Sequence, residues 1–234
     1  MVRRMSDIVK SHIKNDDRYK DWNWTYPLKQ VNFNGVSFKN CSTDLNSSQI
    51  QFEECTFVGC DFSGLDHVCF FQARRCDFSN AIFHDVDLRH LGFGDCKFDQ
   101  ADFSSSHFWD ADFSDWDLTS AKIDPVWKDL FEVLSLAIHE IPFLEDAIAN
   151  GKINGSIYEN PSSDCGCLNG TLLKAAKFSG GPVNSLLNAR SIDRPIEIFC
   201  LNISPGDTPE TNWRLRLILE KIQEFKASLS PAGS

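Results

Sequence analysis

The sequence contains no long apolar run. In its 234 residues no stretch approaches the roughly 18 consecutive apolar residues that a membrane-spanning helix requires. The first residues, Met1–Ile8, carry charge but are not followed by an apolar core, so we expect no signal peptide. Hydrophobic residues make up 42% and charged residues 24%, which is typical of a globular protein and excludes wholesale disorder. We therefore expect no membrane partner.

Positive charge is also scarce. Lys and Arg total 23 against 33 Asp and Glu, which gives a formal net charge of -10. A general nucleic-acid binder needs basic residues to displace counterions, so we expect no direct nucleic-acid partner. The imbalance is concentrated in residues 31–124, where six basic residues stand against sixteen acidic ones, whereas residues 1–30 have a net charge of +3.

Common catalytic and metal-binding patterns are missing. The sequence has no GxSxG, HExxH or DxDxDG pattern and no CxxC pair of the kind found in zinc ribbons. The sequence has nine cysteines, an odd number, and we expect no signal peptide. Together these observations indicate free thiols in a reducing compartment. We therefore expect a cytoplasmic protein that is not an enzyme and that holds no metal or cofactor.

What the sequence does contain is a period of five residues. A small or apolar residue lies two positions before each member of the longest series, and earlier runs at Phe33–Phe38 and Phe52–Phe62 keep the same spacing. Period five fits neither an α-helix nor a continuous β-strand. It fits short extended pieces joined by corners, because positions two apart share a face in extended chain. Units this short bury a core only when they stack. The longest series is Phe78, Phe83, Leu88, Phe93, Phe98, Phe103, Phe108, Phe113, Leu118 and Ile123.

Three segments carry a family resemblance. Cys76-Asp-Phe-Ser-Asn, Ala101-Asp-Phe-Ser-Ser and Ala111-Asp-Phe-Ser-Asp resemble the A(D/N)LXX unit of the pentapeptide-repeat family. The resemblance covers residues 31–124 and implies a right-handed, four-sided β-helix with twenty residues in each coil. Residues 1–30 are then expected to form an N-terminal helical cap on the first coil. Four cysteines fall at the small inward position, where a thiol packs as a small hydrophobe: Cys55, Cys60, Cys76 and Cys96.

The period ends at residue 124, where Asp124-Pro125 is a strong helix-start signal. Residues 125–234 predict a mainly α domain, similar to uncharacterised domains that follow pentapeptide repeats in bacterial or phage proteins. The expected fold class is thus a mainly β solenoid plus α, in three parts: 1–30, 31–124 and 125–234. Within the last part the pattern predicts a first helix that ends at Pro142, helices over 143–150, 165–177 and 185–189, a buried strand over 196–203, and a final helix with Thr208 as its N-cap.

The acidic residues of the repeats form a candidate interaction face. If coils of twenty residues stack, Asp77, Lys97 and Asp117 form one column of alternating charge, and Asp102 and Lys122 form another. Between Lys97 and Lys122 there are six Asp and no Lys or Arg. The residues that we select for this face are Asp95, Asp99, Asp110, Asp112 and Asp115.

Three functions remain open from the sequence. The leading one is a non-enzymatic scaffold for an unidentified protein partner. An alternative, implied by the resemblance, is an acidic DNA mimic that inhibits or protects a DNA-handling enzyme such as gyrase. A third is a ligand- or thiol-based activity in the C-terminal part, because Cys165 and Cys167 are expected at a helix N-terminus, where the dipole lowers a thiol pKa. The sequence favours no particular oligomeric state.

Overall fold

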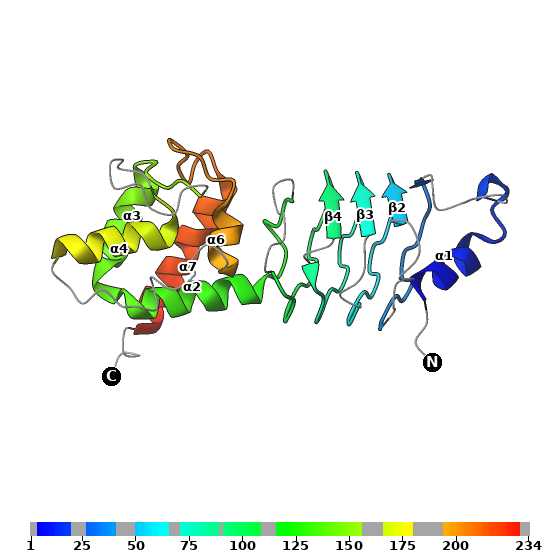
Figure 1. The fold of residues 1–234 in the computed structure, drawn as a ribbon, viewed down its shortest axis with the longest axis horizontal. Helices are drawn as coiled ribbons and strands as arrows, with labels where there is room; N and C mark the ends of the chain where they lie inside the picture. Colours follow the sequence, from blue (N-terminus) through cyan, green and yellow to red (C-terminus); the bar gives the residue numbers. More distant parts are fainter. Residues whose placement is uncertain are drawn as a thin grey trace. The chain divides into compact units, whose positions relative to one another are not determined.

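The chain divides into two compact units, Met1–Pro125 and Val126–Ser234. The computed structural model describes residues 4–19, 27–40, 50–65, 71–88, 91–108, 116–155, 166–179 and 194–229. Figure 1 shows helix α1 and the parallel strands of the first unit, and the helices of the second.

The first unit is a stack of coils built on a parallel sheet. Its strands follow the order β1-β2-β3-β4 and every neighbouring pair is parallel. Isolated bridges join Asp77 to Lys97, Lys97 to Asp117, and Asp102 to Lys122, so residues twenty apart lie side by side as expected. The chain is thus a β-helical solenoid in this unit. Its elements are α1 (Met5–Ile13), η1 (Asp17–Tyr19), β1 (Leu28–Lys29), β2 (Ile50–Glu53), β3 (Phe71–Arg74) and β4 (Leu91–Gly94).

Two columns of stacked phenylalanine rings fill the solenoid. In the first column Phe57 and Phe78 lie 4.7 Å apart between ring centroids and almost parallel. In the second column Phe83 and Phe103 also lie 4.7 Å apart. Phe93 is 5% exposed, which confirms the inward direction of the period-five positions, while Phe113 lies outside the described residues. The full columns are Phe33–Phe57–Phe78–Phe98 and Phe38–Phe62–Phe83–Phe103.

The four repeat cysteines are free and buried, as predicted. Burial raises the pKa of the Cys60 thiol to about 11. Cys96 differs from the others, because a hydrogen bond from Cys76 lowers its thiol pKa although the side chain is buried. These thiols pack as part of the core.

The apolar side chains of helix α1 are buried within the first unit. His12 Nε2 donates a hydrogen bond of 2.5 Å to the carbonyl oxygen of Asn32, and its ring stacks on Phe33 with 4.8 Å between centroids. The helix therefore contacts the first coil. It spans Met5–Ile13, only part of the predicted cap region 1–30, and its buried residues are Met5, Ile8, Val9 and Ile13.

The second unit is mainly helical in its described residues, with one isolated parallel bridge between Ile153 and Gly166. Asp129 fixes the start of helix α6, because its carboxylate accepts the backbone N–H of Ile196 at 3.1 Å and forms an ion pair with Arg194. Helix α7 buries Leu215 and Ile222, while Leu219 is only half-buried. The helices are α2 (Asp124–Leu136), η3 (Ile138–Glu140), α3 (Ile141–Ala149), α4 (Leu168–Ser179), α6 (Pro195–Cys200) and α7 (Trp213–Leu229).

Three details of the helical unit correct the sequence-based expectations. The expected strand over 196–203 is wrong, because Pro195 opens helix α6 and an apolar run suits a helix buried on all sides as well as a strand. Pro142 lies in the first turn of α3, where its missing N–H costs nothing, and α2 already ends at Leu136. Helix α7 begins after Asn212, whose side-chain oxygen accepts the N–H of Arg214 at 3.0 Å, so Thr208 is not its N-cap. The expected helix over 185–189 lies outside the described residues.

Candidate functional site

The predicted acidic face is described only in part. Asp95 and Asp99 are exposed, and neither forms an ion pair with a described residue. Asp99 accepts one hydrogen bond from Ser120, at 3.4 Å. The other three residues selected for this face, Asp110, Asp112 and Asp115, lie outside the described ranges.

In one of the predicted charge columns, the negative charge of Asp102 is neutralised by Lys122 of the same column. The carboxylate of Asp102 lies 3.0 Å from Lys122 Nζ and 3.2 Å from His84 Nε2. Burial would raise the pKa of Asp102, but hydrogen bonds from Ser104, Lys122 and His84 hold it well below its usual value. This side of the solenoid therefore carries less free negative charge than its composition indicates.

A second group of charges lies at the ends of the first strands. Glu53, on β2, forms ion pairs with Lys29, at 2.5 Å, and with Arg75. Arg75 also reaches Glu54, at 3.2 Å, and Gln30 donates a hydrogen bond to Glu54 at 3.0 Å. The side-chain hydrogen bonds from Lys29 and Arg75 lower the pKa of Glu53. Both glutamates are thus already neutralised by basic neighbours.

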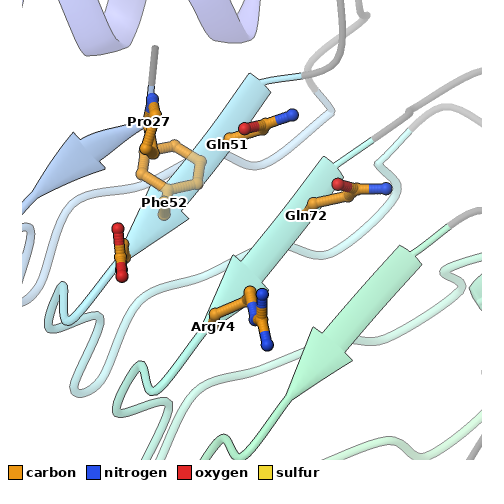
Figure 2. A pocket seen from close by; sticks show the side chains of 6 residues that line it. Pro27, Gln51, Phe52, Gln72 and Arg74 are labelled. Atoms are coloured by element: carbon orange, nitrogen blue, oxygen red, sulfur yellow. The ribbon is translucent and has the colours of Figure 1, made fainter.

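Beside these charges the outer face of the sheet forms a shallow pocket. Its volume is about 150 Å³, and it lies over β2 and β3 with Pro27, just before β1, at its edge. Figure 2 shows Gln51 and Gln72 at matching places on adjoining strands, with Arg74 farther along β3. They line the pocket together with Pro27, Phe52 and Glu53.

Three of the lining side chains are uncommitted, meaning that they form no hydrogen bond or ion pair with a described residue. Within the described residues, the amides of Gln51 and Gln72 and the guanidinium of Arg74 make no hydrogen bond or ion pair. This contrasts with Glu53 and Arg75 beside them. Sequence reasoning missed this pocket, although a signal was available: each of the three occupies an outward position between inward residues of an extended piece.

The candidate thiol in the helical unit is a buried side chain. Cys167 precedes α4 as expected, and its sulfur accepts the N–H of Gly170 at 3.3 Å. Burial raises the pKa of this thiol, and the nearby carboxyl of Glu197 raises it further, so the predicted lowering by the helix dipole is wrong. Cys165, the other candidate thiol, lies outside the described residues.

A buried carboxyl at the start of α4 was not predicted from the sequence. Glu197 Oε1 accepts the backbone N–H of Asn169 at 2.6 Å, so a side chain from α6 caps the neighbouring helix. Burial raises the pKa of Glu197 to about 7. Both polar side-chain atoms of Asn169 are buried without a hydrogen-bond partner among the described residues. The signal in the sequence was a single glutamate inside the apolar run Ile196–Cys200.

Two kinds of feature are absent from the described residues. No three His, Cys, Asp or Glu side chains there converge as a metal site requires. No helix in the described ranges is both long and apolar enough to cross a bilayer.

One comparison with known proteins bears on the solenoid. The family model described as pentapeptide repeats (8 copies) matches residues 96–124. No curated protein matches the chain significantly. The structure of full-length QnrB1, a plasmid-mediated fluoroquinolone resistance protein, is similar with 19% sequence identity and a TM-score of 0.20, over 36% of this chain and 49% of that one. The chain therefore spans about half the length of that structure. The match shows that residues 96–124 of the solenoid are pentapeptide repeats, which agrees with the twenty-residue register of the neighbouring coils.

Proposed function

We propose that the chain is a non-enzymatic scaffold whose solenoid binds a partner protein. The observation that carries the proposal is the outer face of the parallel sheet β1–β4. There a pocket and three uncommitted polar side chains, Gln51, Gln72 and Arg74, lie on rigid strands and are available to a partner. Side chains held on strands keep a fixed spacing, so they offer a preformed surface with little ordering cost on binding.

In this proposal the solenoid is the right-handed, four-sided form with a helical cap. A repeat of five residues and a register of twenty place four units in each coil, which supports four sides. Connections between parallel strands are right-handed in about 98% of cases, which supports the handedness. The buried stripe of α1 and its His12 contacts with the first coil support its role as the cap.

The test compares one substitution at two exposed places on the solenoid. Gln72→Lys adds a charge to the outer face of β3, and Gln100→Lys adds the same charge at an exposed corner. Tagged full-length chains carrying either change are purified from cells that express the protein, and partner recovery is quantified against the unchanged chain. We expect Gln72→Lys alone to reduce recovery of a partner. Equal recovery with both variants, or no partner with the unchanged chain, would contradict the proposal.

A second candidate function is the acidic DNA mimic. It is favoured by the exposed carboxylates of Asp95 and Asp99, which form no ion pair among the described residues. The pairing of Asp102 with Lys122 and His84 weakens it, because a mimic of duplex DNA needs unneutralised charges at close spacing. For this reason we rank it below the scaffold.

A further inference from the structure

The outward side of β4 carries two glycines that the fold does not require. Gly92 and Gly94 both lie outside the left-handed region of backbone conformation. A Cβ atom on Gly92 would meet Gln72 Cγ at 3.4 Å, and one on Gly94 would meet Arg74 Cγ at 3.6 Å, as the nearest described atoms. Both are ordinary van der Waals contacts, so alanine would fit at either position.

Glycine within a strand weakens it, and it commonly marks a place where a ligand or another backbone approaches closely. Gly92 lies beside Gln72 in the sheet, and Gly94 lies beside Arg74. The side chains of Gln72 and Arg74 lean toward β4, with atoms within 4.0 Å of the places where Cβ atoms on Gly92 and Gly94 would stand. The glycine strip of β4 is therefore continuous with the side chains that line the pocket. Together they form an outer surface on β3 and β4 next to the polar side chains of Gln51, Gln72 and Arg74.

The local charge favours a negatively charged ligand. Among the described residues, the charged side chains that line the pocket are Glu53 and Arg74. The ion pairs around Glu53 add Lys29, Arg75 and Glu54, so this group has three positive charges and two carboxylates, and Asp95 on the next coil lies outside it. Both carboxylates are paired with Lys29 or Arg75, so Arg74 holds the excess positive charge. This is a local exception on a chain with a net charge of -10.

The size and chemistry of the pocket restrict the class of ligand further. Its volume of about 150 Å³ is below the roughly 300–1,000 Å³ of an ordinary small-molecule pocket. The planar guanidinium of Arg74 matches a carboxylate through two parallel hydrogen bonds. The amides of Gln51 and Gln72 both donate and accept, which suits the N–H and C=O groups of a peptide backbone.

We propose that this pocket binds an acidic side chain carried on an extended peptide segment of a partner protein. Arg74 binds the carboxylate, Gln51 and Gln72 bind the adjoining peptide groups, and the peptide backbone lies over Gly92 and Gly94. The inference rests on the proposed scaffold function, since it names the chemistry of the partner at the same face.

The first experiment measures peptide binding to the full chain by NMR. Isotope-labelled protein is titrated with the peptide acetyl-Thr-Val-Glu-Val-Thr-amide and with the same peptide carrying Gln at its centre. We expect the Arg74 Nε–H signal and the side-chain amide signals of Gln51 and Gln72 to shift saturably with the Glu peptide. The Gln peptide should bind more weakly by a factor of about ten or more, since a hydrogen bond to a charged group stabilises a complex more than a neutral one does. Equal binding of both peptides, or no saturation with either, would overturn the proposal.

Variants then separate binding from folding. Arg74→Gln should abolish the preference for the Glu peptide, whereas Arg216→Gln, an exposed arginine on α7, should leave it unchanged. The double change Gly92→Ala and Gly94→Ala should keep or raise the thermal unfolding midpoint, because alanine has less conformational freedom to lose. The same double variant should bind the Glu peptide severalfold more weakly. Unchanged binding in either pocket variant would show that the assignment is wrong.

Two further outcomes are distinguishable. A partner that co-purifies equally with Arg74→Gln and with the unchanged chain would keep the scaffold function and overturn the pocket assignment. Arg74-dependent binding of the Glu peptide without any co-purifying partner would support the pocket and contradict the scaffold. Inorganic phosphate that displaces the Glu peptide at lower concentration than the peptide itself needs would overturn the choice of a carboxylate ligand.

Discussion

Truncating Phe98 to alanine should strongly destabilise the solenoid. The ring is 1% exposed, and its centroid lies 5.6 Å from that of Phe78 and 5.2 Å from that of Trp116. The ring of Phe93 is nearly perpendicular to it, with 5.1 Å between centroids. Removing a buried Phe side chain costs about 3–5 kcal/mol, and the cost is larger where neighbours cannot move into the cavity. Backbone hydrogen bonds hold the neighbouring coils in place, such as the 2.8 Å bond from Phe78 N–H to the Lys97 carbonyl. We therefore expect a loss in the upper half of that range.

The assay should report the solenoid alone, because the chain has two units that can unfold separately. Cys60 is a suitable reporter, since it is a buried free thiol of the same core. Brief alkylation across a urea series, read by mass spectrometry of the Cys60 peptide, gives the unfolding midpoint of this unit. Phe143→Ala is the control, because Phe143 is 54% exposed on α3 and should leave that midpoint unchanged. A loss below about 1 kcal/mol for Phe98→Ala would refute the stacked core, since exposed sites typically change stability by less than that.

Three further predictions test other parts of the account. A maleimide should modify Cys60 and Cys167 in the native protein only slowly, because both thiols are buried with raised pKa values, and rapid labelling of either would contradict their placement. Glu197→Gln should flatten the pH dependence of the stability of the helical unit. The folded-state pKa of Glu197 is raised to about 7 from a usual value of 4.5, so its neutral form stabilises fully below pH 4.5 and that contribution is lost as pH rises through 7. An unchanged pH profile, measured by thermal unfolding between pH 4 and 8, would disprove this role. The purified chain should not strongly inhibit gyrase in a supercoiling assay, and potent inhibition that disappears with Asp95→Asn and Asp99→Asn would reverse our ranking of the two functions.

The solenoid could be predicted from the sequence because its signal is periodic and redundant. Each coil repeats large apolar residues at the same inward positions. The positions of Phe78, Phe98 and Leu118 therefore follow from spacing alone, and all three are buried. The column of Asp102 and Lys122 follows from the same arithmetic. By contrast, the helical unit has no repeat, and a run such as Ile196–Cys200 is equally compatible with a buried strand or a buried helix. The structure shows a helix there because Pro195 and the carboxylate of Asp129 fix its first turn.

The candidate site was harder to predict than the fold. Spacing shows that Gln51, Gln72 and Arg74 point outward, but it does not show which outward side chains are already paired. That depends on contacts between coils, such as Arg75 reaching back 22 residues to Glu53. The direction of the Cys167 pKa shift also depended on its surroundings, because burial beside Glu197 outweighs the helix dipole.

The most direct test of the central claim is photo-crosslinking at the outer face of the sheet. A benzophenone amino acid is placed at Gln72 in one full-length chain and at Gln100 in another, since both side chains are exposed on the solenoid. Each chain is irradiated in cells that express the protein. The account predicts a specific crosslinked protein at position 72 that is lost when unmodified chain is added in excess, and no such product at position 100. The same products at both positions, or no product at position 72, would contradict the claim that this face binds a partner.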